Sequence, residues 1–226
     1  MEPPVRSLHV KDRIQLLAAP GGLRAGFWKL VRAVTQLDRY EWLSRDVRDG
    51  ADYQPLATPE AAGVLVSIRS LHDWGLIDPR LREQLDAGSG WGVEPVVSRG
   101  ARIYAFVVAD KVQCQVTIDT RVARINTPCK LEVELQPGEC FLSFLVTTPD
   151  WQRHGLAVAL VQRAMQRLAK DGFRHCHCHV QATNVKSLRT FARAGWVRSG
   201  ALWAWHQDRL LRARLPPGIA VRPCLP

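Results

Sequence analysis

Residues Leu145–Gly172 read LVTTPDWQRHGLAVALVQRAMQRLAKDG, and the interpretation of the whole chain starts from them. They predict an apolar strand, a polar turn and a helix from about Leu156 to Lys170. A helix normally begins at a Ser, Thr, Asp or Asn cap, but here the small residues Gly155 and Ala157 occupy its start. Small side chains leave the free N–H groups and the positive dipole end of the first turn open to a ligand. The pattern is therefore typical of a site for a diphosphate or another anion.

Positive charge is concentrated in the same part of the chain. From Trp151 to the C-terminus there are 13 Lys or Arg against two Asp or Glu, whereas the first 150 residues carry 18 against 19. Within the turn itself, Gln152 offers an amide donor, and Arg153 and His154 face the same region. This asymmetry indicates an anionic ligand or partner in the last third of the chain. A solvated basic face is the alternative for the charge beyond what one ligand needs.

Length and composition indicate an ordinary globular protein. The 226 residues are 46% hydrophobic and 23% charged, which allows one large domain or a domain with an extension. No run of 18 apolar residues occurs and the N-terminus lacks the pattern of a signal peptide, so we expect no membrane span and a cytoplasmic location. The six cysteines show no zinc-type pairing, and we expect reduced thiols.

The N-terminal half contains three patterns of helical period. Residues Leu23–Leu43 carry apolar residues at three- and four-residue spacing and predict one amphipathic helix. A short strand and a second helix follow in residues 53–71, with Thr58 as N-cap and Pro59 at the first helical position. A third helix is predicted to run from Pro79 to Gly88, capped by Asp78.

The pattern changes to a two-residue period after residue 92. Residues 101–119 predict two strands around an Ala-Asp-Lys turn, and residues 129–147 predict another hairpin with Pro137 and Gly138 at the turn. The segment between them, 120–128, is either a continuing strand or an insertion. After the helix of the opening segment the sequence predicts a strand (173–183), a helix (184–195), a closing pair of strands (196–215) and a tail that is loose or packed along the surface (216–226).

Two motifs resemble those of the GNAT superfamily, the Gcn5-related N-acetyltransferases. QRHGLA fits the family's Q/R-x-x-G-x-G/A acyl-CoA signature with Gln152, Gly155 and Ala157. VQATNVKSLRTFARAGW fits the second block with Asn184, Ser187 and Gly195-Trp196. The resemblance covers roughly residues 51–212, about 70% of the chain. It divides the chain into an N-terminal helical extension (1–50), a GNAT domain (51–212) and a C-terminal tail (213–226).

The resemblance implies an α/β (α+β) fold with a mixed central sheet. In this family the strand before the signature separates from the next strand, and the thioester arm of the acyl-CoA lies in the gap. One main-chain N–H there could polarise the thioester carbonyl. The implied acyl-CoA-binding residues are Leu145, Val146, Thr147, Gln152, Arg153, His154, Gly155, Leu156, Ala157, Asn184, Ser187 and Phe191.

Catalytic acids and bases are less clearly marked. Many family members place a Tyr seven residues after the motif Asn as the acid, but this chain has Phe191 there, and a phenyl ring cannot donate a proton. The base in this family is often a Glu on the strand before the signature, which makes Glu139 the candidate, with Glu132 and Glu134 as rivals.

Two aromatic or metal-like patterns lie near the C-terminus. HCHCHV places His175, His177 and His179 on one face of a strand. Residues i and i+4 of a strand are about 13 Å apart, too far for one ion, so we expect no metal site. Trp203 and Trp205 share one strand face, where they either pack in the core or form a wall of the acceptor pocket.

These features predict an acyl-CoA-dependent N-acyltransferase, most simply an N-acetyltransferase, that moves the acyl group directly to an amine. Acetyl-CoA or another acyl-CoA is then the co-substrate. Two alternatives remain: an acidic acyl carrier protein as the donor, and a non-catalytic binding module on the same scaffold. Lys/Arg clusters with interleaved aromatic residues are not obvious, so we do not expect nucleic-acid binding. We expect residues 1–50 to cover the acceptor site or to form a homodimer contact.

Overall fold

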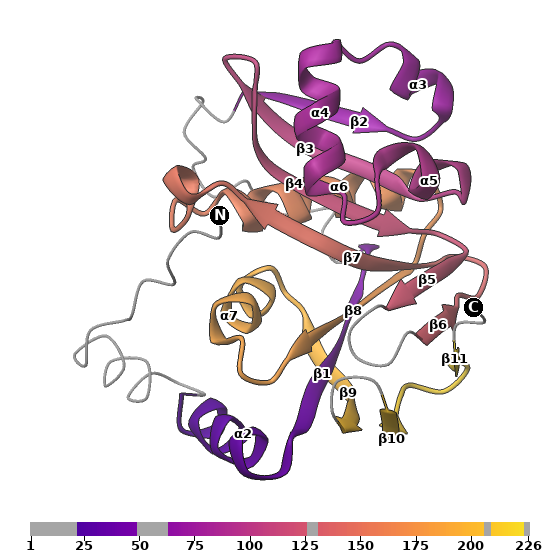
Figure 1. Cartoon of the computed structure of the whole chain (residues 1–226). Coiled ribbons are helices and arrows are strands. Elements are labelled where there is room, and N and C mark those ends of the chain that lie inside the picture. The colour runs from indigo at the N-terminus through magenta and orange to yellow at the C-terminus, as the bar shows by residue number, and fades with distance from the viewer. Residues whose placement is uncertain (1–21, 49–62, 126–130, 206–208, 224–226) are drawn as a thin grey trace.

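The computed structural model describes residues 22–48, 63–125, 131–205 and 209–223 (Figure 1). In chain order the elements are α2 (Gly22–Thr35), β1 (Leu37–Asp46), β2 (Val64–Ile68), α3 (Leu71–Gly75), α4 (Pro79–Gly88), α5 (Val93–Ser98), β3 (Arg102–Val108), β4 (Lys111–Asp119), β5 (Val122–Ile125), β6 (Leu131–Glu134), β7 (Glu139–Thr147), η3 (Pro149–Trp151), α6 (Leu156–Lys170), β8 (His175–Gln181), α7 (Val185–Arg193), β9 (Val197–Trp205), β10 (Arg209–Arg214) and β11 (Ala220–Pro223).

The strands form two sheets. The larger is eight-stranded with the order β10-β9-β1-β8-β7-β4-β3-β2, and the smaller is three-stranded with the order β11-β6-β5. Neighbouring strands are antiparallel everywhere except between β7 and β8, which run parallel. A parallel pair needs a crossover, and α6 is that crossover. The mixed sheet predicted from the sequence is confirmed.

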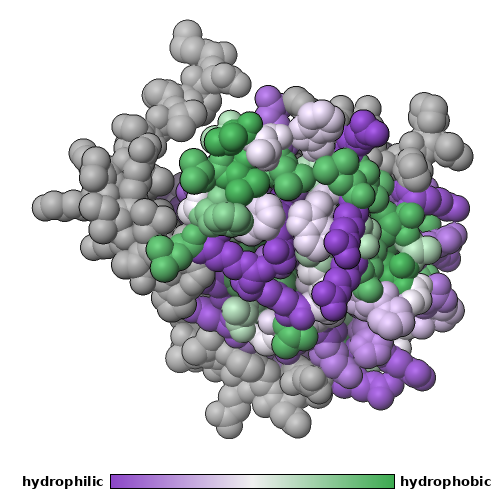
Figure 2. Space-filling model, turned by 90° about the horizontal axis from the view of Figure 1, so that it is seen from below, coloured by the Kyte–Doolittle hydropathy of each residue, from purple (hydrophilic) through white to green (hydrophobic). Residues whose placement is uncertain are grey.

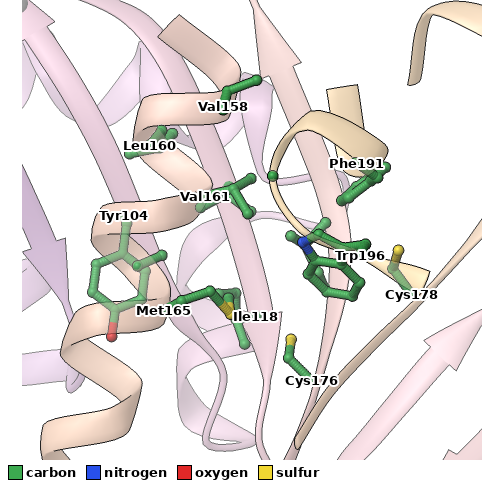
Figure 3. Close-up of a cluster of buried hydrophobic side chains, with 14 of the residues drawn as sticks. Tyr104, Ile118, Val158, Leu160, Val161, Met165, Cys176, Cys178, Phe191 and Trp196 are labelled. Atoms are coloured by element: carbon green, nitrogen blue, oxygen red, sulfur yellow. The ribbon is translucent and has the colours of Figure 1, made fainter. Parts of the chain in front are cut away.

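Each face of the large sheet is covered by a different layer. Helices α6 and α7 pack on one face, where Val161, Met165 and Phe191 belong to the largest apolar cluster (Figure 3). On the other face, α4 and α5 cover the end formed by β2, β3 and β4. The small sheet covers the same face further along, where Trp42 and Phe141 are fully buried against it. Full burial of such side chains contributes about 1.5–3 kcal/mol each.

Several predicted elements are confirmed with their ends. Helix α4 begins at Pro79, and the Asp78 side chain accepts a hydrogen bond from the Arg80 N–H. Helix α6 occupies Leu156–Lys170 as expected. The β3–β4 hairpin turns at Ala109 and Asp110, which both have positive φ. The closing strand pair is β9–β10.

The long helix predicted over Leu23–Leu43 is wrong in its second half. The helix ends at Thr35, Gln36 takes a positive φ, and the chain then enters the large sheet as β1 between β8 and β9. Tertiary pairing overrides the helical pattern because two neighbouring strands bury Tyr40 and Trp42 of this segment. The predicted domain boundary at residue 50 stays a prediction, although β1 pairs inside the sheet.

Three further predictions need correction. The helix predicted to begin at Pro59 starts outside the described residues, and Val64–Ile68 at its end form strand β2. The predicted 129–147 hairpin does not exist, because β6 pairs with β5 and β11 while β7 pairs with β4 and β8. The tail, predicted to be loose or packed along the surface, contains strand β11, which pairs with β6. The undecided segment before residue 126 is strand β5.

Helix α2 turns an apolar face outward. Leu23, Phe27, Leu30 and Val34 are between 58% and 79% exposed. Figure 2, which views the molecule from the side where α2 lies, shows apolar residues in patches between hydrophilic ones. Among the described residues, no helix is both long and apolar enough to cross a membrane.

Candidate functional site

The parallel strands β7 and β8 separate after a short paired segment. They pair only at Glu139 with His175, Cys140 with Cys176 and Phe141 with His177. Beyond this point β7 stays paired with β4 as far as Thr147, and β8 stays paired with β1 as far as Gln181. Among the described strands, β7 is therefore paired only with β4 beyond this point, and β8 is paired only with β1. The strand splay expected at this place is confirmed.

A β-bulge marks the place of separation. Leu142 pairs with Ile118 and Phe144 pairs with Thr117, so Ser143 is the extra residue on β7. A bulge bends its strand and redirects a side chain. The residue after the bulge, Phe144, reaches Gly90 of the α4–α5 connection, where a Cβ would lie 2.3 Å from the ring.

The gap between the strands opens into a cleft of about 340 Å³. One end, which we call the α7 end, is lined by residues of β7 and α7: Leu145, Val146, Asn184, Ser187 and Phe191. The other end, which we call the small-sheet end, is lined by Tyr40, Arg124, Ile125 and Phe141. Ser143, Cys178 and His179 also line the cleft. Because the two ends belong to opposite faces of the large sheet, the cleft reaches both faces.

The first turn of α6 lies directly after β7 and η3 in the chain and has no side-chain cap. Its N-cap residue, Gly155, has a φ of +80°, and a Cβ there would meet nothing within 4 Å. The glycine is thus required by its backbone conformation, and the space beside it is open. Gln152, Arg153 and His154 are all exposed before it. These features form an accessible group of donors at the positive end of a 15-residue helix.

A match to a known protein family identifies the family in which this arrangement occurs. A model of the Acetyltransferase (GNAT) family matches residues 74–196. This chain belongs to the GNAT acetyltransferase family. The match includes the strand separation, the start of α6 and all of α7, so the family resemblance read from the two sequence motifs is confirmed.

Solved structures similar to this chain include other GNAT proteins. A GCN5-related N-acetyltransferase from Sphaerobacter thermophilus is 12% identical, with a TM-score of 0.44 over 81% of this chain and 55% of that chain. One from Kribbella flavida is 12% identical, with a TM-score of 0.43 over 71% and 54%. The ribosomal-protein-S18-alanine N-acetyltransferase of Escherichia coli is 16% identical, with a TM-score of 0.40 over 58% and 76%. The chain spans 54–64% of the length of the first four solved structures that it matches. No curated protein matches the sequence.

The structure divides the predicted acyl-CoA residues of this GNAT chain into two groups. Leu145, Val146, Asn184, Ser187 and Phe191 come together at the α7 end of the cleft. Gln152, Arg153, His154 and Gly155 gather at the start of α6, outside the cleft lining. Between the groups, the Thr147 carbonyl accepts a hydrogen bond from the Gln152 amide at 3.4 Å. The side chain of Leu156 is buried in the core and that of Ala157 is half-buried, so only their backbones face the site.

The Asn184–Ser187 spacing of the second motif has a local structural cause. The Asn184 side chain is the N-cap of α7 and accepts a hydrogen bond from the Ser187 N–H at 3.1 Å. Both residues line the cleft. The motif therefore fixes the start of α7 against the α7 end.

Phe191 stands where many GNAT enzymes carry a Tyr acid. It is 4% exposed and packs edge-on against Trp196 at 5.1 Å between ring centroids. Figure 3 shows Cys178 beside these rings. Burial raises the pKa of the Cys178 thiol well above its ordinary value, so the thiol stays protonated.

Glu139, the base predicted from the sequence, lies where β7 and β8 are still paired and does not line the cleft. Its carboxylate accepts a hydrogen bond from the Gln136 N–H at 3.0 Å and lies 3.7 Å from His177 Nε2. Burial lowers the pKa of His177, while the charge of Glu139 opposes that shift. The catalytic role of Glu139 stays a prediction. Its rivals Glu132 and Glu134 lie on the small sheet and pair with Arg124 and Arg222.

The histidines of β8 have separate surroundings. The His177 ring shares a hydrogen bond with the Ser44 hydroxyl at 2.8 Å, and the His179 ring stacks on Phe141 at 5.9 Å. His175 is exposed. Among the residues that the structure describes, no group of His, Cys, Asp and Glu could hold a metal ion.

Trp203 and Trp205 lie outside the cleft lining. Trp203 is flanked by the guanidinium groups of Arg39 at 5.2 Å and Arg212 at 5.8 Å from its ring centroid. The Trp205 indole N–H donates to the Thr35 carbonyl and so ties β9 to the end of α2.

Several lining residues were missed by sequence analysis: Tyr40, Arg124, Ile125, Phe141, Cys178 and Gln181. Tyr40 was assigned to a helix and Arg124 to an undecided segment. No local motif identifies such residues, because the pairing of β1 and the position of the small sheet bring them together. Phe141, Cys178 and Gln181 lie in predicted strands, but nothing in those strand patterns marks them as lining residues.

Proposed function

We infer that this GNAT chain is an acyl-CoA-dependent N-acetyltransferase that moves an acetyl group from coenzyme A directly to an amine. The observation that carries the inference is the separation of β7 from β8 beside the uncapped start of α6. A separated strand offers unpaired backbone N–H and C=O groups to an extended arm. An uncapped helix start offers backbone donors to a diphosphate.

The start of α6 fits the diphosphate of coenzyme A in shape and in charge. The open space beside Gly155 allows oxygen atoms to approach the backbone, and the exposed Gln152 and Arg153 side chains add donors. His154 adds a ring N–H on the same turn. All three side chains are exposed, so they are accessible to a bound anion.

The α7 end of the cleft would hold the pantetheine arm. The backbone of Leu145 and Val146 faces the gap, while Ser187 and Phe191 form the opposite wall. When bound, acetyl-CoA supplies an activated acetyl group as a thioester. A backbone N–H of the separated strand would polarise the thioester carbonyl, and fixed donors in a partly closed cleft are effective in that role.

The amine would enter from the small-sheet end. Tyr40, Ile125 and Phe141 line this end with apolar and aromatic side chains that are almost fully buried. Arg124 lines it as an exposed residue paired with Glu132. The protein would hold the amine opposite the carbonyl carbon and exclude water. Glu139 as base and an acidic carrier protein as an alternative donor stay predictions, as do a homodimer and a cytoplasmic location.

Binding and turnover test this proposal. Thermal unfolding would be followed with acetyl-CoA, longer acyl-CoAs, free CoA and S-acetylpantetheine, which lacks the nucleotide and its diphosphate. A ligand that binds only the folded state raises the melting temperature, so we expect shifts with the CoA compounds and a much smaller one with S-acetylpantetheine. CoA release would then be measured with a peptide α-amine, a lysine side chain, an aminosugar and a polyamine. No shift with any CoA compound would contradict the proposal.

A further inference from the structure

A half-buried carboxyl lies beside the small-sheet end of the cleft. Asp119 is the last residue of β4 and pairs across the strands with Phe141, which lines the cleft. Its carboxylate accepts a hydrogen bond from the Ser143 hydroxyl. Ser143 is the bulge residue, and it lines the cleft directly. Ser143 therefore forms part of the cleft wall while its hydroxyl is bonded to the Asp119 carboxylate.

The same carboxyl lines a small second cavity. This cavity has a volume of about 10 Å³ and shares Ser143, Phe144 and Arg124 with the large cleft. Asp119, Thr117 and Arg99 line only the small cavity. Ser143 lines both cavities and donates its hydroxyl to Asp119, so it connects the carboxyl to the wall of the cleft.

The surroundings leave this carboxyl able to take up a proton near neutral pH. Burial raises the pKa of Asp119 to about 6, while the Ser143 hydrogen bond and the positive charge of Arg99 oppose the shift. Arg124 of β5 is the other charged side chain that lines the same cavity. A base works best when its pKa lies near the working pH. Glu139, in contrast, lies outside both cavities.

We propose that Asp119 is the group that finally accepts the proton of the attacking amine, reached through the Ser143 hydroxyl. This proposal rests on the proposed acetyl transfer. The ammonium form of the amine gives one proton to Ser143 Oγ as the Ser143 hydroxyl proton moves to Asp119. The neutral amine then forms the C–N bond to the thioester carbonyl carbon, and the C–S bond breaks. The remaining surplus N–H proton goes to the departing thiolate, and Asp119 releases its proton to water.

In this scheme the Ser143 hydroxyl contacts the amine, whereas Asp119 orients that hydroxyl and accepts its proton. In this arrangement the bulge residue Ser143 supplies the hydroxyl that transfers the proton, and Asp119 supplies the carboxylate that receives it. The arrangement also gives the reaction a proton acceptor at the small-sheet end, whereas Phe191, which takes the place of the usual Tyr acid, lies at the α7 end.

Asp119→Asn tests the proposal, with Asp110→Asn as the matched control. Asp110 lies in the turn at the other end of β4, is exposed and has a positive φ that Asn tolerates. Turnover with acetyl-CoA would be measured between pH 5 and 9 using whichever of the four amines releases CoA fastest. For wild type we expect kcat/KM for the amine to rise through an apparent pKa near 6. Asp119→Asn should lower it at least about 100-fold at pH 7 and remove that limb, with the CoA-induced melting shift unchanged.

Ser143 variants separate proton transfer from a structural role. Ser143→Ala removes the hydrogen bond that lowers the pKa of Asp119, so the limb near pH 6 should move to higher pH as turnover falls. Ser143→Thr keeps the hydroxyl and should restore both. Wild-type turnover in Asp119→Asn, or an unmoved limb in Ser143→Ala, would overturn the proposal while leaving acetyl transfer intact. Absence of CoA release in wild type with all four amines would overturn acetyl transfer itself, and this proposal with it.

Discussion

The two ends of the cleft differ in the kind of chemical group that they present. The α7 end, together with the start of α6, presents backbone groups from two continuous segments, β7–α6 and the start of α7. The small-sheet end collects side chains from β1, β5 and β7, and Asp119 of β4 lies behind it. Backbone donors need only a local conformation, such as the positive φ of Gly155. Side-chain groups need strands from distant parts of the sequence to be in register. The first end is therefore readable from motifs, and the second is not.

The largest expected effect concerns the stability cost of the small-sheet end. Asp119 has a folded-state pKa of about 6, raised by burial from its ordinary 3.8. The folded protein therefore favours the protonated carboxyl, and stability is lost as the pH rises from about 4 through 6. A shift of about two units corresponds to at most roughly 3 kcal/mol. Asp119→Asn should lose this dependence, so its free energy of unfolding relative to wild type should increase across that window.

Urea unfolding of both proteins between pH 3.5 and 8 measures this difference. Subtracting the two curves removes the contribution of every other titrating group. Asp110→Asn supplies the control and should show no such trend. If the difference in free energy of unfolding between Asp119→Asn and wild type does not vary with pH, the pKa of Asp119 is not raised in the folded protein. The contrast between the two ends of the cleft would then weaken.

The second effect tests whether the start of α6 works through its backbone. Gly155 and Gly172 flank the same helix, both have positive φ, and a Cβ on either would meet nothing within 4 Å. Alanine at either position should cost a similar 1–2 kcal/mol, roughly, in backbone strain. Only Gly155→Ala should also weaken CoA binding, by about tenfold, because its methyl group would occupy the approach to the amides. Melting temperature and CoA affinity of the two variants provide the comparison, and equal affinities would show that the diphosphate does not bind there.

The smallest effect separates two roles of Asn184. Asn184→Ala removes the cap of α7 and should cost about 1 kcal/mol of stability. Asn184→Asp keeps an oxygen that can accept from the Ser187 N–H, so stability should stay close to wild type. It lacks the amide donor, and CoA affinity should fall about threefold if that donor contacts the pantetheine arm. Wild-type CoA affinity in Asn184→Asp would limit this residue to capping.

The fold could be predicted where local signals agree with the tertiary environment. Helix α4 has a capping Asp and a Pro at its start, and α6 has a continuous apolar stripe against the sheet. Prediction failed over residues 37–43, because a helical spacing of apolar residues continued into a segment that pairs with two neighbouring strands. It failed again for β6, which forms a sheet with β5 and the C-terminal β11 instead of a hairpin with β7.

The candidate site follows the same division. Asn184 and Ser187 could be placed from the sequence because a cap and its partner are three residues apart. Ser143 lies in a segment that the sequence predicts as a regular strand, and a two-residue alternation cannot reveal a bulge. Asp119 had no signal of its own, since its partner lies 24 residues away and the pair depends on the β4–β7 register.

The sequence by itself determined the family, the start of α6 and the position of α7, because glycine conformation, helix capping and apolar period act over a few residues. Only the tertiary structure decided where the large sheet opens, which residue becomes the bulge and which carboxyl lies behind it. Those features arise from competition between strands for partners, and the outcome depends on every strand in the sheet. A local pattern contains no information about that competition, so the small-sheet end of the cleft could be located only after the strands were paired.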